Sequence, residues 1–191
     1  MLKQLIPAIR MLLVLACITG VAYPLAVTAV AHVAFPSQAG GSLLWKDGQV
    51  VGSSLVGQAM DEDRYFWPRP SAVGYDPLPS GGSNLGPTSE QLRLVRASRA
   101  EALRQANGLS DEASLPADLL DASASGLDPD ISPAAAVLQI DRIARAREYD
   151  SSQRQRLVEL VERMIALPQF GLLGEPRVNV LQLNLALDAL R

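Results

Sequence analysis

Histidine and cysteine are almost absent from this chain of 191 residues. The one cysteine, Cys17, and the one histidine, His32, both lie in the same apolar N-terminal segment. The rest of the chain therefore contains no disulfide, no Cys or His metal ligand, no thiol nucleophile and no histidine base. These absences exclude zinc enzymes with such ligands, thiol enzymes and serine hydrolases with a His base.

Charge is absent from residues 11–35, MLLVLACITGVAYPLAVTAVAHVAF. Roughly 20 apolar residues in a helix are enough to cross a hydrocarbon core about 30 Å thick. We therefore expect an N-terminus at 1–10, a transmembrane helix at 11–35 and a soluble domain at 36–191. The mixed helix and strand patterns described below make that domain α+β, with an N-terminal β-hairpin and several helices.

The flanking charges predict the orientation of this span. Lys3 and Arg10 precede it, whereas Lys46 and Asp47 are the first charged residues after it. Because basic flanks stay in the cytoplasm, we expect a cytoplasmic N-terminus and a periplasmic domain at a bacterial inner membrane. A cleaved signal peptide, with Ala29-Val30-Ala31 as the processing site, is the alternative, and it exports the domain as well.

The predicted domain is acidic. Of the 17 basic residues two precede the span, so 15 basic residues face 20 acidic ones after it, a net charge of −5. This balance gives no reason to expect nucleic acid or an anionic membrane surface as a partner.

Local patterns predict the secondary structure of the domain. Asp47-Gly48 between two apolar runs predicts a hairpin. The Pro- and Gly-rich segment 61–87 carries four aromatic residues, which favour an ordered loop over a linker. Thr88 and Gln91 form a capping pair at the start of a helix that Asn107-Gly108 ends. The remaining elements are helices over 116–122, 133–149 and 152–166, then a short strand and a helix within 178–190.

Two loops carry residues that are suited to chemistry. Ser80, Gly81, Gly82 and Ser83 form a glycine-rich turn whose N–H groups are a weak candidate for holding an anion or a nucleotide phosphate. The alternative is a purely structural tight turn. In the second loop, Asp128 and Asp130 are candidates for a hard cation site or an acid–base pair, or are ordinary turn formers.

Two groups of residues are candidates for docking a partner. Small residues four apart in the span would let another helix approach closely, and Pro24 is expected to kink it. In the domain, two arginines flank an aromatic pair, for stacking or for partner contact. The candidate docking residues are Ala16, Gly20, Ala22, Ala26, Arg64, Trp67 and Arg69.

Several motifs occur in a specific order behind the single span. They are Tyr65-Phe66, Arg69-Pro-Ser-Ala72, Ser80-Gly-Gly-Ser-Asn-Leu-Gly-Pro87, Ser125-Gly-Leu-Asp-Pro129, Ile131-Ser-Pro-Ala-Ala135, Leu173-Gly-Glu-Pro176, Val178-Asn-Val-Leu181 and Leu183-Asn-Leu-Ala-Leu-Asp188. In this order the chain resembles the C subunit of the Kdp potassium-transporting ATPase over nearly its whole length.

The resemblance implies a non-catalytic subunit of an ATP-driven potassium import complex. Its partners would be a channel-like subunit that binds potassium, a P-type ATPase subunit that hydrolyses ATP, and a small peptide subunit. The family is described as a catalytic chaperone that raises the ATP affinity of the hydrolysing subunit. A nucleotide-binding role would fall on Ser80 to Ser83, yet the charge rule places that loop on the side that lacks ATP. We therefore expect no directly bound cofactor and an indirect effect on ATP affinity.

Two other hypotheses remain open on the sequence. One is an anchored or secreted enzyme that uses carboxylates, with Asp76 or Asp128 titrating abnormally. The other is a periplasmic binding module for a small solute.

Overall fold

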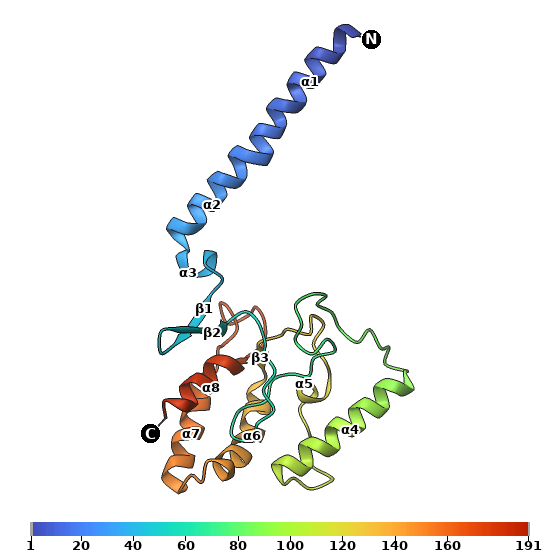
Figure 1. Cartoon of the computed structure of the whole chain (residues 1–191). Coiled ribbons are helices and arrows are strands. Elements are labelled where there is room, and N and C mark those ends of the chain that lie inside the picture. Colours follow the sequence, from blue (N-terminus) through green and yellow to red (C-terminus); the bar gives the residue numbers. More distant parts are fainter. Residues whose placement is uncertain (1, 191) are drawn as a thin grey trace. The chain divides into compact units, whose positions relative to one another are not determined.

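A computed structural model describes residues 2–190, with the side chains given from Gln4 onward. The chain forms two compact units, Met1–Leu43 and Leu44–Arg191 (Figure 1). Helices and short strands are both present in the second unit. This confirms the expected mixture of helix and strand behind one apolar N-terminal helix.

The first unit is dominated by one long apolar helix. Gln4–Ala34 runs for 31 residues, its most apolar stretch has a mean hydropathy of 2.2, and none of that stretch is buried within the structure. This length exceeds the roughly 20 residues that a membrane span needs. The helix therefore fits a single-pass membrane protein. Its parts are α1 (Leu2–Cys17), the π-helical turn η1 (Ile18–Ala22) and α2 (Tyr23–Ala34), and the short α3 (Pro36–Ala39) follows.

Pro24 explains the π-helical turn within this helix. In a regular α-helix the proline ring would collide with the carbonyl of Gly20, four residues earlier, and would leave it without a donor. The structure instead inserts η1 directly before Pro24, and the Tyr23 N–H donates to the carbonyl of Ile18, five residues earlier. The wider turn accommodates the proline without breaking the helix.

The second unit begins with the predicted hairpin. Strands β1 (Leu43–Lys46) and β2 (Gln49–Ser53) pair in one two-stranded sheet. Asp47 and Gly48 between them have φ angles of 52° and 77°, the left-handed conformations that a tight hairpin turn requires. The Asp-Gly prediction is confirmed.

Helices form the body of the second unit. α6 packs against α7 and α4, and α8 packs against α7 (Figure 1). A second two-stranded sheet pairs Asp130 with Asn179 and Ile131 with Val178, antiparallel. The bounds are α4 (Glu90–Asn107), α5 (Ala117–Leu120), β3 (Asp130–Ile131), α6 (Pro133–Ala146), α7 (Ser151–Arg163), β4 (Val178–Asn179) and α8 (Val180–Asp188).

The helix ends follow their capping chemistry and correct some predicted boundaries. Ser89 caps α4, because its hydroxyl accepts from the Leu92 N–H, so the predicted Thr88 cap is wrong by one residue. α6 ends at Ala146 rather than near 149, because Glu148 adopts a left-handed φ of 55° that cannot continue the helix. α5 and α7 are likewise shorter than predicted, and the strand–helix order of the tail is confirmed.

The core lies where α6, α7 and α8 meet. It also includes Phe66, which is fully buried although it belongs to an irregular segment. That segment follows β2 and has no helix or strand before α4. Since buried backbone groups must be hydrogen bonded, this segment needs partners from elsewhere in the fold.

Candidate functional site

Side chains from α6 and α8 supply the hydrogen bonds that the irregular segment needs. The Asn184 side chain takes the place of a neighbouring strand: its Oδ1 accepts from the Phe66 N–H at 2.8 Å, and its Nδ2 donates to the Phe66 carbonyl at 3.0 Å. Gln139 does the same for Trp67, accepting from its N–H at 2.7 Å and donating to its carbonyl at 3.2 Å. Two amide side chains thus fix two consecutive residues of the loop.

Arg142 is the third member of this arrangement and is only 2% exposed. Its guanidinium donates to the carbonyls of Asp63 at 2.6 Å and Tyr65 at 3.0 Å, and it lies 4.0 Å from the centre of the Trp67 ring. Burial lowers the pKa of Arg142 to about 10, so it remains a cation at neutral pH. A charged guanidinium at this position donates hydrogen bonds to several loop carbonyls at once. We call Gln139, Arg142 and Asn184 the polar lock.

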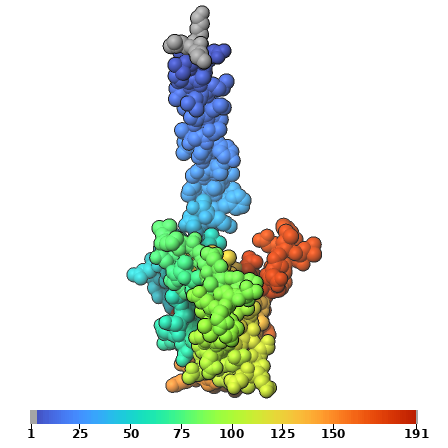
Figure 2. All heavy atoms as spheres, turned by 90° about the vertical axis from the view of Figure 1, so that its right-hand side faces the viewer, coloured from blue at the N-terminus to red at the C-terminus, as the bar shows by residue number. Residues whose placement is uncertain are grey.

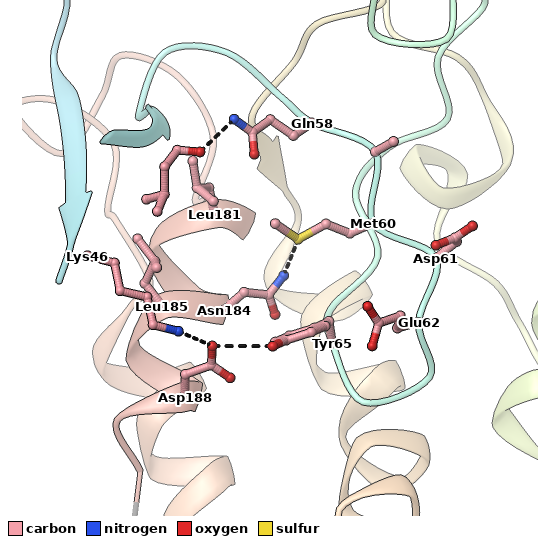
Figure 3. A pocket seen from close by; sticks show the side chains of 12 residues that line it. Lys46, Gln58, Met60, Asp61, Glu62, Tyr65, Leu181, Asn184, Leu185 and Asp188 are labelled. Carbon is pink, nitrogen blue, oxygen red and sulfur yellow. Dashed lines mark hydrogen bonds and ion pairs between the residues drawn. The ribbon is translucent and has the colours of Figure 1, made fainter. Parts of the chain in front are cut away.

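Asp188 joins the end of α8 to the same segment. It pairs with Lys46 at 2.7 Å and accepts from the Tyr65 hydroxyl at 3.3 Å (Figure 3). It also pairs with Arg147 at 2.8 Å. Burial raises the pKa of Asp188, but the hydrogen bonds from Lys46 and Arg147 outweigh this and lower it. Asp188 is therefore an ionised structural anchor that is already engaged with two cations.

A cavity of about 300 Å³ lies beside this anchor (Figure 3). Its wall combines apolar side chains from β2 and α8 with the ion pair of Lys46 and Asp188 and the exposed Asp61 and Glu62. Within residues 2–190 no cluster of His, Cys, Asp or Glu is arranged to hold a metal ion. The cavity walls are suited to packing and recognition.

The glycine-rich turn packs against a second loop. The Gly81 N–H donates to the Ser125 carbonyl at 2.9 Å, and a Cβ on Gly82 would lie 3.1 Å from the Ala124 carbonyl oxygen. Close backbone contact therefore accounts for Gly82, whereas a Cβ on Gly81 would meet nothing within 4 Å. Gly82 and Ser83 also border an open cavity of about 490 Å³ that Arg99 lines, so an anion at this turn stays a prediction.

The two loop aspartates each face an arginine. Asp128 pairs with Arg69 at 2.8 Å, and Asp130 pairs with Arg177 at 2.9 Å. Burial raises the pKa of Asp130, while hydrogen bonds from Asn179 and Arg177 oppose the rise. These contacts give both carboxylates structural roles in joining loops.

The residues predicted to dock a partner fall into two groups. Trp67 and Arg69 serve the domain itself, through Arg142 and Asp128, whereas Arg64 is exposed. The small residues of the span, Ala16, Gly20, Ala22 and Ala26, are all exposed on the first unit. Ala26 also belongs to a shallow apolar depression of about 380 Å³ on α2.

Known relatives identify the family. The family model described as KdpC, the c chain of K+-transporting ATPase, matches residues 5–189. A protein named potassium-transporting ATPase KdpC subunit from Methylococcus capsulatus is 52% identical over 194 residues, with 100% of both chains covered. Proteins of the same name from Sorangium cellulosum and Paraburkholderia phytofirmans are 53% and 50% identical, covering 100% of both chains in the first case and 97% of this chain and 96% of the relative in the second. The chain belongs to the KdpC family. The predicted resemblance is confirmed, and the chain is a subunit of a potassium-transporting ATPase complex.

Sequence reasoning missed the polar lock of this KdpC chain. One signal was present: Gln139 and Arg142 are three apart on the face that carries Ile140 and Ile143, where polar residues are unexpected. It also missed an apolar turn at 167–173, where the Phe-Gly-Leu-Leu-Gly run places large side chains at a position that usually carries polar ones.

Proposed function

We propose that this KdpC chain is a non-catalytic accessory subunit that is anchored by its apolar helix and presents an exported domain to the other subunits. The domain docks on the potassium-entry face of the channel-like subunit. It assists assembly and raises the ATP affinity of the P-type ATPase subunit from a distance. The observation that carries the proposal is the family match over residues 5–189.

The internal pairing of candidate catalytic groups supports a non-catalytic role. Asp128 and Asp130, two of the candidate carboxylates, each pair with an arginine. A general base must reach a substrate proton with a free lone pair, and these carboxylates are directed at cations of their own domain.

The charge distribution supports an exported domain. Lys3 and Arg10 flank the apolar helix on its N-terminal side, and basic flanks remain cytoplasmic. ATP would then be on the opposite side of the membrane from the Ser80 to Ser83 turn. An effect on ATP affinity must therefore pass through a conformational equilibrium of the complex, which the subunit biases by binding one state more tightly.

The test measures topology and ATP affinity on the same complex. A reporter enzyme that is active only in the periplasm, fused after Arg191, should be active, and the matching cytosolic reporter should be silent. The complex without this chain should assemble poorly or need more ATP for half-maximal potassium-stimulated hydrolysis. A fusion active only in the cytosol, or unchanged ATP dependence without the chain, would contradict the proposal.

A further inference from the structure

A short turn after α7 exposes four large apolar side chains that are not part of the core of the domain. Leu167, Phe170, Leu172 and Leu173 are 74%, 91%, 86% and 61% exposed, within seven residues. Figure 2 shows this orange-red part of the chain projecting from the surface of the second unit. Monomeric soluble proteins rarely gather large apolar side chains in one exposed patch unless it binds something.

The turn is a built hairpin. Ala166 and Arg177 form an antiparallel bridge, and Gln169 and Leu173 form another nearer the tip. Between them Phe170 has a φ of 54°, a left-handed conformation that bulky residues rarely adopt. Asparagine or glycine would suit this backbone better, so the phenylalanine ring serves something other than the local fold. We call residues 166–177 the apolar finger.

The charges around the apolar finger indicate the kind of surface that it meets. The finger carries two charged side chains, Glu175 and Arg177, and Arg177 is already paired with Asp130 at 2.9 Å. Loops that insert into an anionic leaflet carry free lysine or arginine beside their apolar residues. The part of the chain after the span has a net charge of −5, from 15 basic and 20 acidic residues, which also disfavours such a leaflet.

We propose that the apolar finger inserts into an apolar pocket on the exported surface of another subunit of the potassium-transporting complex. Membership of the KdpC family places such subunits beside this chain. The inference rests on the proposed function, because it names the surface through which the accessory subunit docks. Four large apolar side chains at a projecting tip are a suitable anchor set for a protein pocket.

The first experiment weakens the finger without disturbing its backbone. Phe170→Asn with Leu172→Ser keeps a residue that tolerates a left-handed φ and removes two apolar anchors. Because burying one such side chain is worth about tenfold or more, the double variant should bind the rest of the complex at least about 100-fold more weakly. Leu94→Ser with Val137→Ser, two apolar residues 56% and 55% exposed on α4 and α6, is the matched control and should co-purify normally. Equal retention of both variants would overturn the proposal.

The second experiment identifies what covers the finger. A photoreactive benzoylphenylalanine at position 170, in the whole complex in native membranes, should give a covalent adduct with another subunit, while the same group at position 94 should not. Adducts with lipid alone, or none, would overturn the proposal. If position 170 cross-links to a subunit but deletion of the chain leaves ATP dependence unchanged, the docking surface stands and the proposed function fails. If position 170 gives no protein adduct but deletion changes ATP dependence, the proposed function stands and the docking surface fails.

Discussion

Replacing Asn184 by leucine tests the polar lock with the least change in shape. Asn184 is 2% exposed, and its amide bonds both backbone groups of Phe66, which is fully buried. Leucine fills a similar volume but leaves the Phe66 N–H and carbonyl without partners. Since each orphaned buried group costs about 1–3 kcal/mol, we expect the free energy of unfolding to fall by about 2–5 kcal/mol. A domain of this size is stable by only about 5–15 kcal/mol, so the loss is a large part of the total.

The assay is urea unfolding of the full chain in mild detergent, followed by tryptophan fluorescence. With a slope of about 2 kcal/mol per molar urea, the midpoint should fall by about 1–2.5 M. Gln182→Leu is the matched control, because Gln182 lies in the same helix, is half-buried, and its side chain makes no hydrogen bond among residues 2–190. If the two variants unfold at the same urea concentration, the Asn184 hydrogen bonds to Phe66 do not hold the loop in place.

Three further changes test the other contacts. Arg142→Met should lower the free energy of unfolding by about 2–4 kcal/mol in the same assay, because lost charged hydrogen bonds outweigh the relieved burial of a cation. Gly57→Ala places a Cβ 2.5 Å from the Asp128 carbonyl oxygen and should cost about 1–3 kcal/mol of unfolding free energy, whereas Gly86→Ala, with nothing within 4 Å, should be neutral. The folded pKa of Asp188 lies below the usual 3.8, so its stabilising contribution is present above that value and is lost as the pH falls further. Asp188→Asn should therefore show a smaller fall of its urea midpoint on acidification than the unmodified chain, while the remaining fall comes from other carboxylates with a lowered pKa, such as Asp121.

Features that depend on neighbours in the sequence were predictable. The turn at Asp47-Gly48 needs only two residues with left-handed φ, and the cap at Ser132 needs only a side-chain oxygen followed by a helical stripe. The long apolar helix was also predictable, because its length and its lack of charged residues are visible in the sequence. The error at Thr88 arose because the adjacent Ser89 has the same capping chemistry, and sequence alone does not choose between them.

Features that join distant parts of the chain were not predictable. Phe66 and Asn184 are 118 residues apart, and the β3–β4 pairing joins Asp130 to Asn179 through only two residues from each strand. A strand of two residues does not indicate which other strand it pairs with, and a polar residue on an apolar helix face, such as Gln139, does not indicate which backbone groups it bonds. The segment after β2 was expected to be ordered from its aromatic content, but that composition does not say which side chains order it.

The polar lock and the apolar finger together suggest how this subunit divides its residues between stability and recognition. Gln139, Arg142 and Asn184 direct their polar groups at backbone within the domain, so the irregular segment is rigid before any partner arrives. A preorganised domain loses less conformational entropy on docking than a flexible one. The finger, in contrast, presents large apolar side chains that are mostly exposed to solvent. A chain built in this way gains free energy chiefly when its apolar residues are covered by another protein, which is the behaviour expected of a subunit that acts within a complex.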